Sequence, residues 1–179
     1  MKTNELIQLF RPIIVNGLLA LGYPNVSVVQ SFQPTQQGIN NGPTVYFFKI
    51  YDHRYGFLKR QDTWDPISET MIHTETQGYE TMFQVNALMT QNPANTSQIV
   101  VSDLVNECAQ ILQSDIAINA LFEQDVQILR ITDIRNPYFV DDRDRFEGIP
   151  SFDFVLTYSN VSVSTSPVVD LLQPGFYRV

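Results

Sequence analysis

The sequence predicts an α+β fold, in which a mixed and mostly antiparallel sheet carries helices packed on one face. Its 179 residues suffice for one compact domain, and 44% of them are hydrophobic against only 17% charged, which favours a folded core over disorder. Apolar residues recur at helical spacing in three segments, and runs of β-branched and aromatic residues occupy much of the remaining chain. We therefore expect a single domain spanning residues 1–179.

The first segment, residues 1–22, is predicted to form an amphipathic helix, because its apolar side chains recur every three or four residues. Thr3 or Asn4 can cap this helix, and Gly22 can end it. Pro12 lies inside the pattern. Because proline lacks a backbone donor, we expect a kink or a separate first turn there.

The next part of the chain is predicted to form strands. Residues 26–32 and 44–51 are typical of two neighbouring strands in a wide hairpin, because Pro, Gly and Asn residues separate them. Residues 52–68 mix basic and aromatic side chains without periodicity, which indicates a long projecting loop or an irregular hairpin. Residues 71–76 and 79–89 flank the pair Gln77-Gly78, which is typical of a two-residue turn.

The second half of the chain returns to helical spacing and then to strands. The predicted elements are a helix at 101–112, a short helix that Ser114-Asp115 caps, strands at 126–134 and 152–158, and a possible strand at 161–165. Between the strands, residues 135–150 are irregular. Residues 166–179 are predicted to be an extended C-terminal tail, too short to bury its own apolar side chains, which we expect to dock on a neighbouring subunit.

The charge of the chain disfavours one class of function. Nineteen acidic and eleven basic residues give a net charge of −8, and residues 91–179 hold twelve of the acidic but five of the basic ones. General DNA binding is disfavoured, because its affinity comes from neutralising phosphates. Cys108, the single cysteine, lies in an apolar helical repeat, which predicts a buried core residue in a reducing compartment. No segment has the pattern of a secretion signal or a membrane span.

Motifs for catalysis are absent from the sequence. It contains no nucleophile elbow, phosphate loop, dinucleotide fingerprint or Cys-x-x-Cys pair. His53 and His73 do not have the spacing of a metal-binding pair. We therefore expect a protein that is not an enzyme and that needs no cofactor.

Two clusters are candidates for protein contacts. In the first, residues 53–64, exposed rings and basic side chains suit either an acidic protein partner or single-stranded nucleic acid, and the net acidity favours the protein. The second lies in residues 135–150, where alternating charges suit a subunit interface, a solvated loop or a hard cation. The candidate interface residues, with two from the C-terminal tail, are Arg54, Tyr55, Phe57, Lys59, Arg60, Trp64, Arg135, Tyr138, Asp141, Asp142, Arg143, Asp144, Arg145, Phe176 and Tyr177.

The segment LRITDIRNPYFVDDRDRFE at residues 129–147, followed by PSFDF at 150–154, resembles the neck or tail-terminator proteins of tailed bacteriophages. Supporting matches are ETMFQV at 80–85, SDLV at 102–105 and GFYRV at 175–179, so the resemblance covers most of the chain from about Val26 onward. The order of the predicted elements also looks like the tail-terminator fold. The long segment is specific for the family but carries no catalytic motif.

This resemblance implies a virion protein assembled in the bacterial host cytoplasm, with no membrane partner. It implies a ring of identical subunits, most often a hexamer, that ends tail-tube polymerisation and joins the tail to the head connector. The implied partners are the chain itself, the tail tube protein, the head connector or neck protein, and a sheath protein if the tail is contractile. DNA would pass through the lumen without specific binding.

Two hypotheses follow from such a ring. The charges of residues 141–147 would pair with residues 53–60 of a neighbour, so that charge reversal at Asp141, Asp142 and Asp144 should prevent assembly. The net acidity would let DNA slide past a wall that repels phosphates. The alternatives are another phage ring protein, such as a tail tube or head-completion protein, and a metal-dependent enzyme built on Asp133 and the aspartates of the 141–144 cluster.

Overall fold

The computed structural model describes residues 1–30, 42–89, 95, 97–140 and 146–167. Its helices are α1 (Thr3–Ala20), α2 (Val101–Gln113) and α3 (Asp115–Phe122). Its strands are β1 (Ser27–Gln30), β2 (Thr44–Asp65), β3 (Thr70–Leu88), β4 (Val126–Ile131), β5 (Tyr138–Val140), β6 (Phe146–Gly148) and β7 (Ser151–Pro167).

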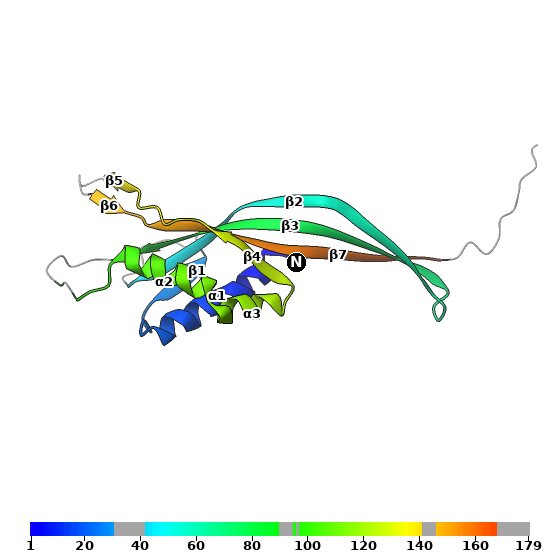
Figure 1. Ribbon diagram of the computed structural model, residues 1–179, viewed down its shortest axis with the longest axis horizontal. Coiled ribbons are helices and arrows are strands. Elements are labelled where there is room, and N and C mark those ends of the chain that lie inside the picture. The colour runs from blue at the N-terminus through cyan, green and yellow to red at the C-terminus, as the bar shows by residue number, and fades with distance from the viewer. Residues whose placement is uncertain (31–41, 90–94, 96, 141–145, 168–179) are drawn as a thin grey trace, which may run out of the picture.

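Five strands form one mixed sheet in the order β1-β2-β3-β7-β4, and β5 and β6 form a separate antiparallel pair. Strands β1 and β2 are parallel, while the other neighbours in the large sheet are antiparallel. The three helices gather on one face of this sheet (Figure 1). The predicted α+β fold class, a mostly antiparallel mixed sheet with helices on one face, is confirmed.

The core lies between the helices and this face of the sheet. Phe10 of α1 is fully buried at its centre, and its ring lies 5.0 Å from that of Phe47, 4.9 Å from that of Phe83 and 5.2 Å from that of Phe154, measured between centroids. The three partners come from β2, β3 and β7. Edge-to-face packing of this kind adds to the hydrophobic gain, so one helix residue ties three strands together.

Strands β2, β3 and β7 continue past the helices as a three-stranded extension, which we call the arm and define as residues 52–80 and 159–167 (Figure 1). The nine residues of β7 in the arm span roughly 30 Å at the rise of an antiparallel strand. No residue of the arm is buried. The arm is therefore a sheet with solvent on both faces, which adds no hydrophobic core of its own.

The arm corrects two expectations. Residues 52–68 are not a projecting loop: β2 continues to Asp65, so this segment is one side of a long hairpin with a shift of register between Tyr55 and Lys59. Gln77 and Gly78 do not form a turn, because β3 runs unbroken through them and pairs with Asn160 and Ser159 of β7. Since neither face of the arm is covered, its β2 segment, residues 52–65, lacks the alternation of apolar and polar residues that marks a half-buried strand.

Three further expectations were wrong in detail. The runs at 26–32 and 44–51 do not form a hairpin, because β1 and β2 pair in parallel. The possible strand at 161–165 is not separate, because β7 is continuous from Ser151 to Pro167. The stretch 135–150 is not wholly irregular, because it contains β5 and β6. Local composition identifies strands but does not encode which neighbour a strand pairs with, or in which direction.

The helices agree more closely with expectation. The buried residues of α1, Leu6, Phe10, Ile14 and Leu18, follow the predicted spacing. Two details differ: the helix runs through Pro12 without a separate first turn, and its N-cap is Lys2 rather than Thr3 or Asn4. The side chain of Ser114 accepts a hydrogen bond from the Ala117 amide and so caps α3, as predicted. Cys108 is fully buried in the core. Within the described part of the chain, no helix combines the length and apolar character of a membrane span.

Candidate interaction surfaces

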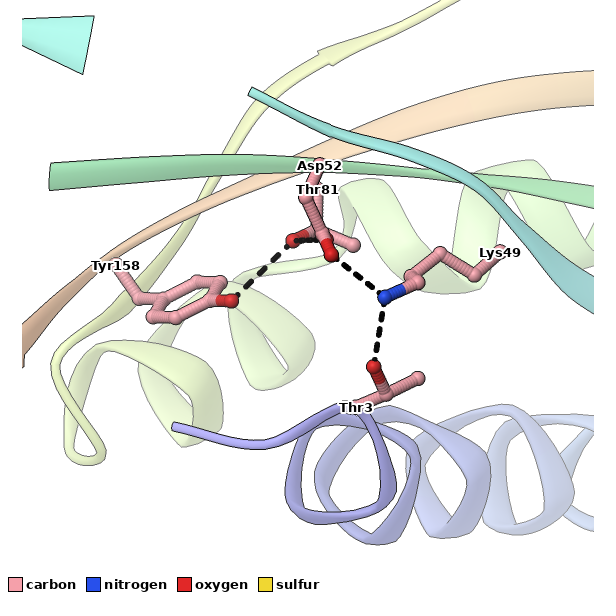
Figure 2. Close-up of polar contacts among 5 residues, drawn as sticks. All are labelled: Thr3, Lys49, Asp52, Thr81 and Tyr158. Atoms are coloured by element: carbon pink, nitrogen blue, oxygen red, sulfur yellow. Dashed lines mark hydrogen bonds and ion pairs between the residues drawn. The ribbon is translucent and has the colours of Figure 1, made fainter. Parts of the chain in front are cut away.

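A polar network fixes the arm to the helices at its root (Figure 2). The Lys49 ammonium donates to the Thr3 hydroxyl of α1 at 2.9 Å and to the Asp52 carboxylate at 2.6 Å. Thr81 of β3 donates to the other oxygen of Asp52 at 2.7 Å, and its hydroxyl lies 3.4 Å from that of Tyr158 on β7. The Asp52 carboxylate thus joins β2 to β3, while the Lys49 ammonium extends the network to α1 and the Thr81 hydroxyl extends it to β7.

A bulge in β2 makes this network possible. Residues three apart in a regular strand point to opposite faces, so Lys49 and Asp52 would not meet. The register shifts between Lys49 and Tyr51, which leaves Ile50 as an extra residue and brings both charged side chains to the face that α1 covers. Burial alone would raise the pKa of Asp52, but the hydrogen bonds from Lys49 and Thr81 and the charge of Lys49 outweigh it and lower that pKa below its ordinary value.

A second bulge, formed by Gly56, Phe57 and Leu58, lies farther along β2. Tyr55 pairs with Gly78 and Lys59 pairs with Thr76, so the three bulge residues face only Gln77 on β3. Gly56 has φ +70, a left-handed conformation that favours glycine. The bulge places Phe57 wholly in solvent, with a relative exposure of 101%.

Neighbouring side chains brace the second bulge. The Gln77 amide donates to the Tyr55 carbonyl at 2.7 Å and to the Gly78 carbonyl at 3.2 Å. The Tyr55 ring lies against Gly78, where a Cβ would come within 2.7 Å of Tyr55 Cζ. A bulge of this kind re-aims a side chain, and here the supported backbone on either side directs Phe57 away from the sheet.

Several basic residues of the arm are engaged within the chain. Arg60 forms a salt bridge of 3.0 Å with Glu75 on β3. The Arg54 guanidinium lies 5.7 Å from the centroid of the Tyr79 ring, which stacks on Tyr158. These exposed contacts are each worth about 1 kcal/mol or less, so they orient the side chains without preventing contact with a partner.

The tip of the arm is a tight turn between β2 and β3. The Asp65 carboxylate accepts the Ile67 amide at 3.0 Å and the Ser68 hydroxyl at 2.7 Å, and these bonds lower the pKa of Asp65. Ile67 is 93% exposed beyond the turn, while Trp64 is partly covered at 44%. The turn therefore also presents an apolar side chain to solvent.

A second surface, the acidic helix pair, is formed by α2, α3 and the turn after α3. Residues 101–125 contain no lysine or arginine, and their acidic residues are Asp103, Glu107, Asp115, Glu123 and Asp125. Next to it, an apolar groove of about 510 Å³ lies between α3 and the edge strand β4. Its lining includes Leu112, Ile118, Phe122, Ile128 and Arg130. Periodicity in the sequence did not indicate this groove, although the absence of basic residues from 101–125 was a visible signal of an acidic surface.

At the opposite end of the sheet, Arg135 is positioned by a charged hydrogen bond. Its guanidinium donates to the Asp153 carboxylate of β7 at 2.6 Å, and Gln84 of β3 donates to the same carboxylate at 2.8 Å. The Arg135 backbone also exchanges hydrogen bonds of 2.8 Å with Ser151. This contact fixes the start of the segment that leads to β5 and β6.

The structure separates the candidate interface residues of the sequence. Arg54, Tyr55, Phe57, Lys59, Arg60 and Trp64 all lie on the arm, whereas Arg135 and the backbone of Tyr138 lie at the β5–β6 end (Figure 1). Asp141, Asp142, Arg143, Asp144, Arg145, Phe176 and Tyr177 fall outside the described residues. Among the residues that are described, no three His, Cys, Asp or Glu side chains gather as a metal site would require.

A comparison with protein families identifies a relationship that covers most of the chain. The family model of the E217 gateway protein gp29 matches residues 5–168, which is most of the chain. No curated protein matches it. The match supports the broader part of the resemblance, a phage head-to-tail gateway protein, while membership of the tail-terminator family stays a prediction. The chain belongs to the family of the E217 gateway protein gp29.

Proposed function

We propose that this chain is a structural protein of the virion that forms a ring at the head-proximal end of a phage tail. In this role it ends tail-tube polymerisation and joins the tail to the head connector. The family match over residues 5–168 supports a position at the head–tail junction. The terminator role rests on the resemblance of residues 129–147 to tail-terminator proteins.

The observation that carries the proposal is the arm. A sheet of three strands with solvent on both faces contributes little to the stability of an isolated subunit, because it buries no core. Such a surface gains stability when another molecule covers it. An arm held at its root by Lys49 and Asp52 therefore fits a subunit that is built to contact neighbours.

The partners in this role are further copies of the chain in a ring, most simply a hexamer, together with the tail tube protein and the head connector or neck protein. A sheath protein joins them if the tail is contractile. The net charge of −8 suits a lumen through which DNA passes without specific binding. In this role the protein acts through its contacts with other subunits and through its surface charge, and it requires no reaction and no cofactor.

The test is electron microscopy of particles from cells infected with a phage that lacks this gene. A terminator predicts unattached filled heads and tails of uncontrolled length, and wild-type protein supplied from a plasmid should restore joined particles. Normal infectious particles would contradict a structural role. Purified protein that stacks into long tubes, rather than stopping at one ring, would identify a tail tube protein instead.

A further inference from the structure

We propose that the second bulge of one copy docks into the groove between α3 and β4 of the next copy, with Phe57 as its anchor. The inference deepens the proposed function and rests on it, because it assigns the contact that would close the ring. The groove is thus occupied by the bulge of a second copy of this chain. Four features of the structure support it: the groove, the bulge, the charges beside each and their separation within one chain.

The groove is an apolar surface that lacks a cover within the described chain. Ile118 and Phe122 of α3 line it and remain 48% and 63% exposed, and Ile128 and Leu112 complete its apolar part. Its volume of about 510 Å³ lies within the usual range for sites that enclose a ligand group, roughly 300–1,000 Å³. Arg130, also in the lining, offers a guanidinium that stacks favourably on an aromatic ring.

The bulge supplies the matching anchor. Phe57 is the most exposed of the large apolar side chains in the described chain. The backbone beside it is fixed by the left-handed Gly56 and by the Gln77 amide, which donates to the carbonyls of Tyr55 and Gly78 at the edge of the bulge. Aromatic side chains that enter a partner's pocket supply much of the affinity of protein interfaces. A pre-formed anchor loses less conformational entropy on binding than a mobile one does.

The charges beside the two surfaces are complementary. Arg54 and Lys59 flank the second bulge, and residues 53–60 contain no acidic residue, although Arg60 pairs with Glu75 of the same chain. The groove adjoins α3, whose acidic neighbours are Asp115 at its start and Glu123 and Asp125 after its end. Two copies of a chain with net charge −8 repel one another. A specific contact is therefore favoured when the basic residues of one copy lie against an acidic surface of the next copy.

The two surfaces do not satisfy each other within one chain. The bulge is on β2, which β3 and β7 separate from β4 in the sheet, and the arm extends away from the helices (Figure 1). Each copy therefore has one donor surface and one acceptor surface. This is the arrangement of a heterologous contact, which forms a closed ring when the rotation between copies closes.

Cysteine crosslinking tests the contact directly. One tagged copy carries Leu58→Cys, beside the anchor in the bulge and 41% exposed, and a differently tagged copy carries Gln127→Cys in the groove lining, so that Phe57 and the apolar lining stay intact. The mixture is then oxidised. The native Cys108 does not compete, because it is buried and its thiol pKa is raised to about 12. We expect a disulfide between the two tagged copies at least about tenfold above the control pair, Leu58→Cys with Leu19→Cys, whose partner on α1 is 58% exposed.

A second set of variants tests the energetics. Phe57→Asp should weaken self-association about 30-fold or more in analytical ultracentrifugation, the usual effect of removing an interface anchor. The control is Ile67→Asp, at the equally exposed tip of the arm. Lys59→Glu should weaken association, and Glu123→Lys in the same chain should restore part of it. Circular dichroism confirms that each variant folds.

The outcomes separate this contact from the proposed function. Rings that persist in Phe57→Asp, or crosslinks no stronger than the control, overturn the contact but leave a terminator possible. If Phe57→Asp rings stay intact but no longer bind tail tubes, the bulge contacts the tube protein, and the proposed contact between copies is overturned. A wild-type chain that stays monomeric and forms no crosslink overturns it as well. Normal particles without the gene would overturn the function itself.

Discussion

The Tyr55 ring occupies the space that a side chain at Gly78 would need. A Cβ placed on Gly78 would come within 2.7 Å of Tyr55 Cζ and 2.9 Å of Cε2. The two residues are direct partners in the β2–β3 ladder, just before the bulge that carries Phe57. Gly78 is thus a site of close approach inside a strand, which is one of the recognised uses of glycine there.

Gly78→Ala should destabilise the arm. The new methyl group must displace the Tyr55 ring or shift the ladder; because that ring is 42% exposed and can move, we expect a cost at the low end of the roughly 1–3 kcal/mol typical of overpacking. Hydrogen exchange should show faster exchange of the amides in residues 70–80, and urea unfolding should show lower global stability. Gly42→Ala is the matched control, because nothing lies within 4 Å of a Cβ there. Equal effects of the two substitutions would contradict the argument.

Asp52 should make stability depend on pH. Its pKa is lower in the folded chain than in the unfolded one, so its contribution is present above the unfolded pKa and is lost as pH falls through the folded pKa. Asp52→Asn should therefore lower the free energy of unfolding at pH 7, by less than about 1 kcal/mol because the site is partly solvated. Its effect at pH 3 should be smaller.

The pKa of Asp52 can also be followed directly by NMR titration of the side-chain carboxyl carbon. Thr81→Val removes a hydrogen bond of 2.7 Å to the charged form and should raise the midpoint. Glu80→Gln, the neighbouring change on β3, serves as the control. A midpoint for Asp52 that is unchanged by Thr81→Val would contradict the network as described.

Phe10→Ala should be the most damaging single truncation on α1. It removes ring contacts with Phe47, Phe83 and Phe154 and leaves a cavity, which typically costs about 3–5 kcal/mol. Leu19→Ala lies on the same helix but at a 58% exposed position, where we expect a change within about 0.5 kcal/mol. Chemical denaturation measures the free energy of unfolding of both variants. Similar losses of stability in the two would mean that Phe10 is not at the centre of the core.

Cys108 should be unreactive in the folded protein. A thiol pKa of about 12 leaves only about one thiolate in ten thousand at pH 8, and the side chain is buried. A thiol reagent such as Ellman's reagent should therefore label the chain only in denaturant. Rapid labelling of the native protein would mean that α2 opens readily from the core.

Periodicity predicted the covered parts of the molecule well and the uncovered parts poorly. The buried face of β3, Phe83, Val85 and Ala87, was visible in the sequence because a core selects apolar residues at every second position. The arm was not visible, since neither of its faces is buried and Gln77-Gly78 imitates a turn. The groove combines residues of α2, α3 and β4, which come together only through tertiary packing.

The candidate contacts stay predictions. Residues 53–64 form a basic and aromatic segment of the arm, and their pairing with residues 141–147 stays a prediction because residues 141–145 lie outside the described structure. Arg60 already pairs with Glu75 of its own chain. Charge spacing in a sequence indicates which groups need partners, whereas the direction of each strand decides which partners are within reach.

The ladder between β3 and β7 keeps one register from Thr70–Pro167 at the tip of the arm to Asn86–Ser151 in the core. A force that pulls the arm along its length therefore loads the hydrogen bonds of both segments together, in shear, instead of opening them one at a time. Strands held in this way resist tension best along their own axis. The arm can thus carry load from a neighbouring molecule straight into the folded base, without a hinge between them.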